Sequence, residues 1–416
     1  MQIGFALLEA GTVRAKNTKN ILLKSIIITS VVGLTFWAFG YSFAYGEGGA
    51  SPNSFMGGTN FFMSSDKEAK GSFYAKWMYQ WAIAAVATTI VSGAMAERCR
   101  FAAYLIYATV ISGFIYPVVV HWGWSSEGWL SPFRQADDDE GYEPELGANG
   151  FIDFAGSGIV HMVGGGAALV GSIFLGARSG RFRSDGTVVE LASHSTIFSA
   201  LGAMILWFGW YGFCTVHTLA ITKMEIASKV AVTTTLSACA GACTTTLIHV
   251  ATGSAVDVIP TLNGLLAGLV AISGPCVVVE PYAAAIIGLI AGCICYSSST
   301  LLRNLQIDDP LDAAPIHFFC GAWGCIATGF FATATNTRNA YGTSEDDYGA
   351  FYNGGGKQLG IQLVGTLAIA SWTCGTSGLL FLGLSQARIL RISFEDEIAS
   401  MDENEGNLSG KELVEA

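Results

Sequence analysis

Two histidines stand inside uncharged, apolar segments of the chain. His161 lies in SGIVHMVGGGAALVGSIFLGA (157–177), and His317 lies in APIHFFCGAWGCIATGFFA (314–332). A neutral imidazole has one donor nitrogen and one acceptor nitrogen, so two facing rings can share a proton and fix each other's tautomer. Such a pair suits a small, polar solute that forms hydrogen bonds and can give up a proton. A permanent alkali cation would instead require rings of oxygen ligands.

Small residues follow both histidines at helical spacing. Gly164 and Gly165 follow the first, and Gly321 and Gly324 follow the second. Counted along the chain, the two segments are the fifth and tenth hydrophobic spans, so they run in opposite directions. Two five-helix halves of inverted topology would bring them together at the centre, as in many transporters. One histidine on an apolar helix commonly makes an interhelical contact, but ionisable groups at two matching positions indicate a substrate or proton path.

The depth of the two histidines differs when it is counted from the sequence. His161 lies eleven residues after Gly150, where a polar loop ends, and at 1.5 Å per residue this is about 16 Å into the membrane. His317 follows Asp312 by only five residues. It therefore reaches the middle of the membrane only if the preceding segment re-enters the protein, which the periodicity does not indicate.

Composition sets the class of protein. The 416 residues are 51% hydrophobic and 13% charged, with a mean hydropathy of +0.47, whereas soluble domains have about 25% charged residues. We therefore predict a polytopic membrane protein and exclude a soluble enzyme. The net charge of −11 argues against nucleic-acid binding. The chain has no zinc-type CxxC pair and no phosphate-binding GxxxxGK[ST] motif, so neither a metal nor a cofactor is expected. The ten cysteines lie in or beside apolar runs and are interpreted as packing residues.

Ten segments are long and apolar enough to span a bilayer as helices. The short start MQIGFALLEAG resembles the second half of a further, truncated helix, which gives an all-α protein of eleven spans. The span at 262–279 holds Gly274 and Pro275, so its second half is expected to be broken. The ten predicted spans are 20–44, 74–96, 101–122, 154–177, 194–216, 227–249, 262–279, 281–302, 314–335 and 358–386.

Basic residues in the loops predict the orientation. Clusters at 98–100 and 178–183 have no counterpart in the short loops of the other side, so the positive-inside rule places the N-terminus outside and the C-terminus in the cytoplasm. Residues 1–386 are thus expected to form a transmembrane domain and residues 387–416 a cytoplasmic tail, in part disordered. Acidic loops at 136–145 and 344–348 are interpreted as solvated, with enrichment of cations at an entrance as the alternative.

Nine segments together resemble one known family, and they cover nearly the whole chain. This family is the ammonium transporters of the Amt/Mep/Rh superfamily, and the chain is most similar to its eukaryotic Amt members. The resemblance implies an eleven-helix homotrimer in the plasma membrane, with a pore for ammonium or ammonia in each subunit. The segments are GFALLEAGTVRAKNTKNIL, YQWAIAAVATTIVSGAMAERCRF, YPVVVHWGW, DFAGSGIVHMVGG, WFGWYGF, NGLLAGLVAIS, VVVEPYAA, DDPLDAAPIHFFCGAWG and RISFEDEIASMD.

The resemblance also implies roles for individual residues. His161 and His317 match the family's twin histidines in the pore. Trp124 matches the aromatic residue of the outer recruitment site, where cation–π attraction helps to hold ammonium, and Trp210 also lines that mouth. Asp153 matches an acid that orients backbone near the outer site without touching substrate. In the hydrophobic gate, Phe213 matches one of two stacked phenylalanines.

Several positions depart from the family pattern. Ile83 stands where the second gate phenylalanine is expected, so the constriction should be looser and its cation–π support weaker. Cys214 replaces an asparagine, and His217 replaces the serine of the recruitment site. Ser273 stands for a nearby threonine, and Pro275 for a glycine.

These departures leave alternatives open. One hypothesis is that uptake falls as the outside pH drops through the titration range of His217, and the alternative is drift in a poorly conducting paralogue. Two other functions remain possible on the same fold: an ammonium sensor or regulatory subunit, and an Rh-like pore for another small neutral solute such as carbon dioxide. Met1 aligns inside the first helix of the family. The stretch from Arg388 to Met401 resembles the family's regulatory tail, but the sequence names no cytosolic regulator.

Overall fold

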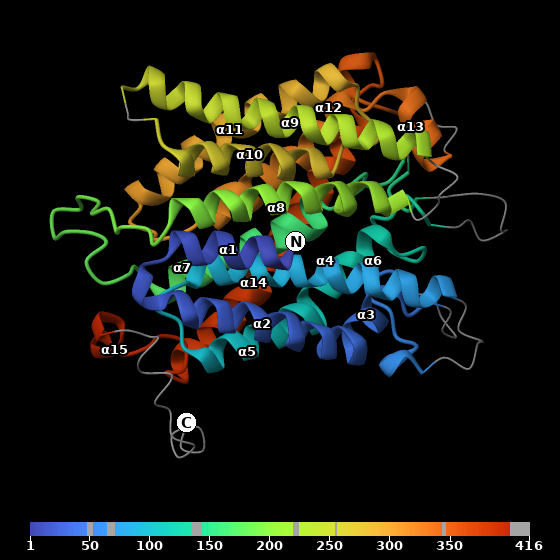
Figure 1. Cartoon of the computed structure of the whole chain (residues 1–416). Helices are drawn as coiled ribbons and strands as arrows, with labels where there is room; N and C mark the ends of the chain where they lie inside the picture. The colour runs from blue at the N-terminus through green and yellow to red at the C-terminus, as the bar shows by residue number, and fades with distance from the viewer. Residues whose placement is uncertain are drawn as a thin grey trace.

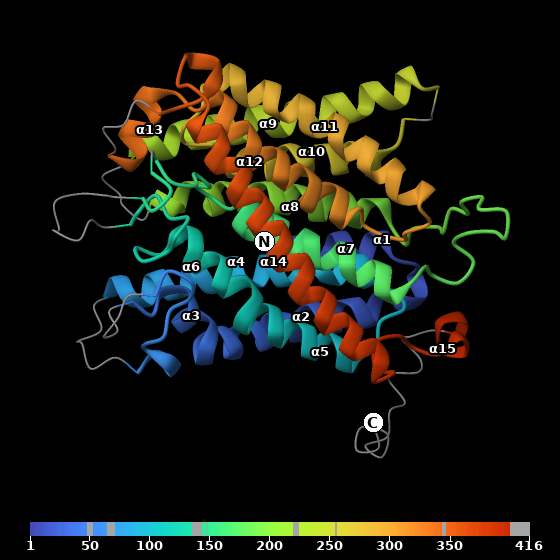
Figure 2. The same ribbon diagram turned by 180° about the vertical axis from the view of Figure 1, so that it is seen from behind.

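The computed structural model describes residues 1–47, 53–64, 71–134, 144–147, 149–218, 224–253, 256–342 and 347–399. Figures 1 and 2 show a bundle of helices packed side by side, with the connecting loops gathered at its two ends. Within the described residues there is no β-strand, and only two isolated bridges occur. Most of the acidic segments 136–145 and 344–348, and the tail from residue 400, lie outside the described residues.

The first half of the bundle ends with the helix that carries His161. Several of its spans contain a π-helical turn, in which i→i+5 hydrogen bonds widen the helix locally. Its elements are α1 (Gln2–Thr12), η1 (Ala15–Asn17), α2 (Thr18–Thr35), η2 (Phe36–Gly40), α3 (Tyr41–Tyr45), η3 (Phe61–Met63), α4 (Gly71–Met95), α5 (Phe101–Val110), η4 (Ile111–Ile115), α6 (Tyr116–Trp124), η5 (Ser157–Met162) and α7 (Val163–Leu175).

The second half repeats this arrangement and adds a long last helix and a short helix in the tail. Its elements are α8 (Thr196–Thr215), η6 (Val216–Thr218), α9 (Met224–Ala251), α10 (Val258–Ser273), α11 (Pro281–Asn304), η8 (Ala314–Phe319), α12 (Cys320–Phe331), α13 (Ala334–Tyr341), η9 (Ala350–Tyr352), α14 (Lys357–Gln386) and α15 (Phe394–Ala399).

All ten predicted spans coincide with helices. In the described part of the chain, nine helical segments are long and apolar enough to cross a membrane, and Val258–Ser273 is a shorter apolar helix. The predicted break in 262–279 is confirmed, since α10 ends at Ser273 and the chain then turns. The predicted span 314–335 is wrong at its end: α12 stops at Phe331, and α13 is a separate helix whose N-terminus is capped by Thr333.

Close packing of α1 against α8 depends on glycine. A Cβ added to Gly11 would lie 2.4 Å from the backbone nitrogen of Ser199, and one added to Gly202 would lie 2.4 Å from that of Leu8. Helices in lipid gain stability from such close backbone approach. These two contacts hold the short α1 against the start of the second half.

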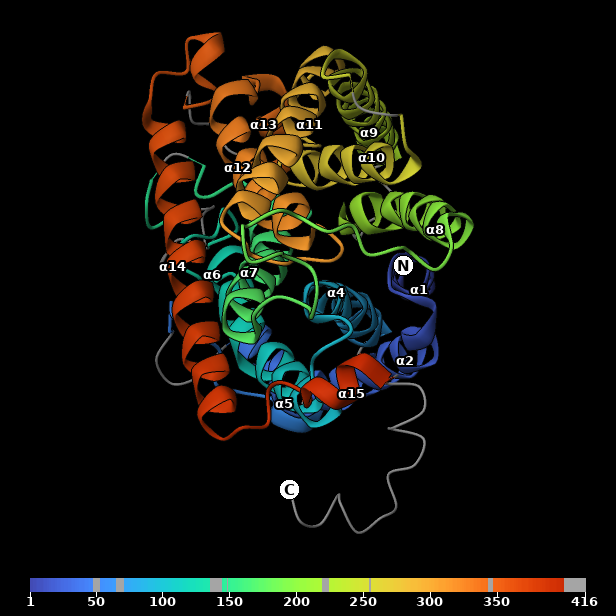
Figure 3. The ribbon, with the colours of Figure 1, turned by 90° about the vertical axis from the view of Figure 1, so that its left-hand side faces the viewer.

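Helix α14 crosses the bundle obliquely and contacts both α7 and α12 (Figure 2). Figure 3, which looks along the helices, shows it on one side of the molecule, with α1 and α8 on the opposite side. Its buried Gln362 donates to the carbonyls of Ile152 and Cys325, both at 2.9 Å, and accepts from the backbone N–H of Ile152 at 2.8 Å. One amide side chain therefore ties together the segments that precede His161 and follow His317.

Candidate transport path at the paired histidines

The structure brings His161 and His317 into direct contact. Their Nδ1 atoms are 3.2 Å apart, and the rings lie almost parallel, with centroids 5.2 Å apart and an interplanar angle of 20°. The exposed fractions are 0% and 5%. Because both contacting atoms are Nδ1, one ring donates and the other accepts, so the pair holds one proton between them. The buried Nε2 of His161 has no hydrogen-bond partner among the described residues, so it is free to meet a solute.

The contact is possible because the two opposed segments approach through glycine. A Cβ on Gly165 would lie 2.3 Å from the backbone nitrogen of Phe318, and a Cβ on Gly321 would lie 2.4 Å from the carbonyl oxygen of Ser157. Each glycine follows its histidine by four residues. The same close approach therefore occurs at matching positions of the two inverted halves. The chain before His317 does re-enter the protein: it turns through Asp312, which has a φ of +52°, and continues into η8.

Asp153 holds the start of η5. Its Oδ2 accepts hydrogen bonds from the backbone N–H groups of Gly158 at 3.0 Å and Ile159 at 2.8 Å, and the residue is 2% exposed. Two N–H groups that would otherwise lack partners at the helix start are satisfied in this way. The indole of Trp124 donates to the carbonyl oxygen of Asp153 at 2.8 Å, so the position of this tryptophan is tied to the same turn.

Trp210, which the family resemblance places at the outer mouth, lies against the ring of His161 in the structure. Its indole is fully buried and stacks on the ring of His161, with centroids 5.1 Å apart and an interplanar angle of 11°. The indole N–H donates to Oγ of Ser273 at 3.0 Å. Phe213 packs against both rings, at 5.6 Å from each centroid. Trp210 is thus placed to fix the plane of the His161 imidazole.

The side chain of His217 packs among residues that the family resemblance places at the mouth. Its ring centroid lies 4.6 Å from that of Trp124 and 5.2 Å from that of Phe154, and its Nδ1 is 3.5 Å from the hydroxyl of Tyr79. The same hydroxyl donates to the carbonyl of Phe213. Sequence reasoning missed Phe154 and Tyr79. Tyr79 stands one helical turn before Ile83, a spacing that could have indicated it.

An apolar cavity of about 250 Å³ lies between α1, α4 and α8, and both Ile83 and Phe213 line it, together with Met1, Tyr79 and Gly209. Ile83 is 2% exposed. The sequence places these two residues together as a hydrophobic gate, and the structure places both on one cavity.

Replacing Ile83 with phenylalanine is expected to narrow the hydrophobic gate that the family resemblance implies at this position. We expect uptake of methylammonium to fall at least about tenfold relative to ammonium, since one extra carbon in a tight apolar site costs about 1–3 kcal/mol. Competitive uptake of the two ions in vesicles measures the ratio. Ile83→Leu conserves the volume and serves as the control. An unchanged ratio in Ile83→Phe would show that this cavity does not constrict the path.

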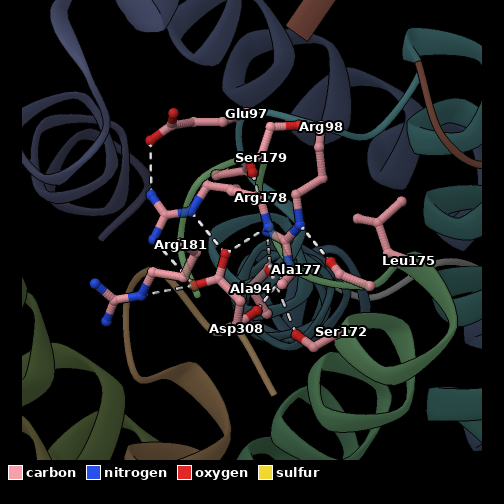
Figure 4. Close-up of polar contacts among 12 residues, drawn as sticks. Ala94, Glu97, Arg98, Ser172, Leu175, Ala177, Arg178, Ser179, Arg181 and Asp308 are labelled. Atoms are coloured by element: carbon pink, nitrogen blue, oxygen red, sulfur yellow. Dashed lines mark hydrogen bonds and ion pairs between the residues drawn. The ribbon is translucent and has the colours of Figure 1, made fainter. Parts of the chain in front are cut away.

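Figure 4 shows a buried ion-pair cluster that links the loop after α7 to the segment before η8. Arg178 contacts Asp308 through Nε at 2.8 Å and Glu97 through Nη1 at 2.9 Å, and Arg181 lies 3.5 Å from Asp308. Arg98 donates to the carbonyls of Ala94, Ala96, Gly176 and Asp308 at 2.6–3.0 Å. The cluster joins the ends of α4 and α7 to the segment that enters η8.

The first residues of the tail dock onto this cluster. Glu397 accepts from the backbone N–H of Ser179 at 2.6 Å and pairs with Arg391 at 2.8 Å, and Lys16 donates to the carbonyl of Glu397 at 2.7 Å. Burial opposes ionisation of Glu397, but the N–H of Ser179 and the charge of Arg391 lower the pKa of this carboxyl. The helix α15 is thereby held beside the loop that follows α7.

These observations define a helical multi-pass membrane protein with two inverted halves that meet at a pair of buried histidines. Comparison with known proteins agrees with this class. The profile of the Ammonium Transporter Family matches residues 1–410, and the chain belongs to this family.

Relatives support the assignment over most of their length. The chain is 44% identical over 407 residues to "Ammonium transporter 1 member 1" of Arabidopsis thaliana, covering 95% of this chain and 79% of the relative. It is 41% identical to "Ammonium transporter 3" of Dictyostelium discoideum, covering 97% and 88%. Among solved structures, "Sensor Amt Protein" superposes with a TM-score of 0.84 at 30% identity, covering 97% and 94%. Candida albicans Mep2 superposes with a TM-score of 0.81 at 28% identity, covering 95% and 83%.

Proposed function

We propose that the chain conducts ammonium or ammonia across the membrane along a path through His161 and His317. The contact of their Nδ1 atoms, at 3.2 Å, is the observation that carries this proposal. The names of its relatives, which are ammonium transporters of plants and of Dictyostelium, support the choice of solute. The function is transport and not catalysis.

The first step is capture of ammonium at the mouth. Trp124 offers its ring face to the cation, and His217 offers a neutral nitrogen as an acceptor. Ser273 and Cys214 lie behind them, with Oγ and Sγ 3.9 Å apart. Asp153 shapes the site through the backbone and does not contact the solute.

The second step is loss of a proton. Taking an ammonium ion out of water into an apolar passage costs much more free energy than taking neutral ammonia. Deprotonation before the gate formed by Phe213 and Ile83 lowers that cost. Ammonia then hydrogen-bonds to the two imidazoles, and the shared proton between them provides a separate route for the proton.

We also propose the assembly and topology that the family resemblance implies. The chain forms a homotrimer in the plasma membrane with one pore per subunit and its C-terminus in the cytoplasm. Met1, which the sequence placed outside, lies about halfway along the bundle (Figures 1 and 2), beside Gly209 of α8. Residues 1–386 are the membrane domain, and residues 387–416 are the cytoplasmic tail. The clustering of basic residues at one end of the bundle supports this orientation. These residues are Arg98, Arg178 and Arg391.

Reconstituted protein tests the function. We expect a transient current or an internal pH change when ammonium is added outside proteoliposomes, with saturation and competition by methylammonium. A sensor that does not conduct would bind ammonium without either signal. A pore for carbon dioxide would pass that gas at a rate that ammonium does not reduce.

His217 changes one expectation drawn from the sequence. It lies just after the end of α8, where burial and the nearby Lys76 ammonium lower its pKa from 6.5 to about 3. The ring therefore remains neutral between pH 5 and 8, and it becomes charged only near pH 3. We therefore propose that His217 does not set the pH dependence of uptake between pH 5 and 8.

In His217→Ser we expect faster uptake, because the ring no longer fills the space between Trp124 and Phe154. The shape of the pH profile from pH 5 to 8 should match that of the unmodified protein. Initial rates of ammonium uptake at a series of outside pH values measure both quantities. An acid limb that disappears in the serine variant would show that His217 does titrate in this range.

A further inference from the structure

His121 is a fully buried histidine whose two ring nitrogens both face carbonyl oxygens. It lies in α6, one helical turn before Trp124. Its Nδ1 is 3.0 Å from the carbonyl oxygen of Ala44, and its Nε2 is 2.7 Å from the carbonyl oxygen of Asn53. A carbonyl oxygen accepts hydrogen bonds and cannot donate one, so each contact requires an N–H on the ring. A neutral imidazole has one N–H, whereas the imidazolium has two.

The other five of the six histidines in the chain do not have this double contact. Among the hydrogen bonds between described residues, each of them uses Nδ1 alone, and a neutral tautomer satisfies each contact. The need for two N–H groups is therefore specific to the ring in α6. The five are His161, His194, His217, His249 and His317.

The end of α3 favours a positive charge on this ring. Ala44 lies in the last turn of the helical span Ala15–Tyr45, and the free carbonyls at the C-terminus of a helix stabilise a nearby cation. Figures 1 and 2 show α3 beside α6 at one end of the bundle, and the two helices are in contact. A buried cation is costly unless its donors are paired, and here both N–H groups of the imidazolium have an acceptor.

The elements around His121 carry few charged groups. Glu47, just after α3, accepts from Oγ of Ser125 at 2.8 Å and from the N–H of Ser126 at 2.9 Å. Lys76 of α4 lies 4.0 Å from the ring centroid of Tyr45, and the described residues 53–64 contain no titratable side chain. Among all these types of side chain, only histidine ordinarily changes charge between pH 5 and 8. The other titratable residues on the elements that contact α6, or directly beside it, are Tyr41, Tyr116, Glu127, Asp153 and His161.

We propose that His121 positions Trp124 as an imidazolium, and that capture of ammonium weakens when the outside pH rises and the ring loses its second proton. The proposal rests on the transport path and orientation proposed above, because Trp124 belongs to the capture site. With one N–H left, a nitrogen lone pair faces a carbonyl oxygen, and that contact becomes repulsive. Either the end of α3 or the segment at Asn53 then separates from α6.

The link to the capture site runs through the last turn of α6. Two side chains of this helix hold residues 53–55: His121 contacts the first of them, and the indole N–H of Trp122 donates to the carbonyl of Phe55 at 2.9 Å. The helix ends at Trp124. When the contact at His121 is lost, this turn is held less firmly, and the ring of Trp124 is less well placed to attract the cation.

Solid-state NMR on the full-length protein tests the protonation state. The protein is labelled with ¹⁵N-histidine and reconstituted in proteoliposomes. At pH 6, the signals that vanish in His121→Gln should show both ring nitrogens protonated, and they should change to those of a neutral ring as the pH is raised to 9. An unprotonated ring nitrogen at pH 6, or a ring that stays charged at pH 9, would overturn the proposal.

Assignment of these signals does not depend on the variant. If His121→Gln does not assemble, coupling of Nε2 to the carbonyl carbon of ¹³C-labelled asparagine identifies the ring in the unmodified protein, since this nitrogen lies 2.7 Å from the carbonyl oxygen of Asn53.

Uptake kinetics test the positioning role. The KM for the ammonium ion should rise about tenfold between pH 6 and pH 9, the lower range for loss of a hydrogen bond to a charged group, with kcat little changed because binding is affected and not a later step. His121→Gln should show the raised KM at every pH, since an amide is uncharged and has both N–H groups on one nitrogen. His194→Gln is the control: this exposed ring contacts the carbonyl of Ala10 through Nδ1 at 3.3 Å, and its variant should keep the unmodified profile.

Two kinetic results would contradict the proposal. One is a pH dependence of KM in His121→Gln that equals that of the unmodified protein, and the other is its disappearance in His194→Gln. A protein that shows the NMR signals of a charged His121 but carries no ammonium current would refute the transport function, while the assignment of the imidazolium would stand.

Discussion

Replacing His317 with asparagine is expected to lower ammonium uptake about 100-fold, the lower range of what a positioned acid–base group contributes. Asparagine keeps a hydrogen-bonding group in the passage, but it cannot exchange a proton between two nitrogens. It also removes the ring that contacts Nδ1 of His161 at 3.2 Å. Initial uptake rates in vesicles, normalised to the amount of assembled protein, measure the effect.

The double variant His161→Asn/His317→Asn should lose little more than either single variant. Groups that act as one unit are strongly non-additive, and the two imidazoles hold a single proton between them. His249→Asn is the control, since this half-buried histidine of α9 bonds the carbonyl of Thr245 at 2.8 Å, away from the pair. Additive losses at the two positions would mean that the rings act separately, and a loss in the control would point to general damage.

Hydropathy was sufficient to predict the membrane helices because the bilayer requires long uncharged segments, whatever their partners. It failed where a short polar helix packs outside the bundle. Helix α13, Ala334–Tyr341, contains Asn336 and Arg338 and has no apolar run, so nothing in its composition marks it as a helix. Its start is fixed by the side chain of Thr333, which accepts from the backbone N–H of Asn336, a local signal of weak specificity.

The histidine pair was predictable, but its surroundings were not. Matching positions in two inverted halves indicated that His161 and His317 meet. The depth of His317 depended on a re-entrant turn that tertiary packing sets. The stacking of Trp210 on His161 and the filling of the mouth by His217 depend on contacts between helices far apart in the sequence, and a pattern along one chain carries no such information.

The contact between the two histidines depends on helix ends that are fixed independently. On one side, Asp153 and Trp124 hold the start of η5. On the other side, the cluster of Arg178 with Glu97 and Asp308 holds the end of α7 against the segment before η8. Because η5 and η8 carry the two histidines, a displacement at either end changes the distance between the rings.

Replacing Arg178 with alanine is therefore expected to destabilise the protein by about 3–5 kcal/mol, the usual effect of removing one partner from a buried ion pair. The side chains of Arg178, Glu97 and Asp308 are 6%, 0% and 1% exposed, so water cannot replace the lost guanidinium. Thermal unfolding in detergent measures the loss. Arg183→Ala, an exposed arginine of the same loop, is the control and should change little. Equal shifts in the two variants would show that the cluster does not stabilise the fold.

The same cluster makes the stability of the fold depend on pH, and its carboxylates determine the direction of that dependence. Burial opposes ionisation of Asp308, but hydrogen bonds and charge from Arg178 lower its pKa from 3.8 to about 2. Burial likewise opposes ionisation of Glu97, and Arg178 and Arg14 lower the pKa of that carboxyl. A carboxyl group whose pKa is lower in the folded than in the unfolded protein stabilises the fold at pH values above its unfolded pKa. This stabilisation is lost as the pH falls, here from about pH 4 to pH 2. Arg178→Ala removes much of the interaction that lowers the pKa values of Asp308 and Glu97. The variant should therefore lose less stability than the unmodified protein over that interval, and a steeper loss would contradict the assignment of Arg178 as the main partner.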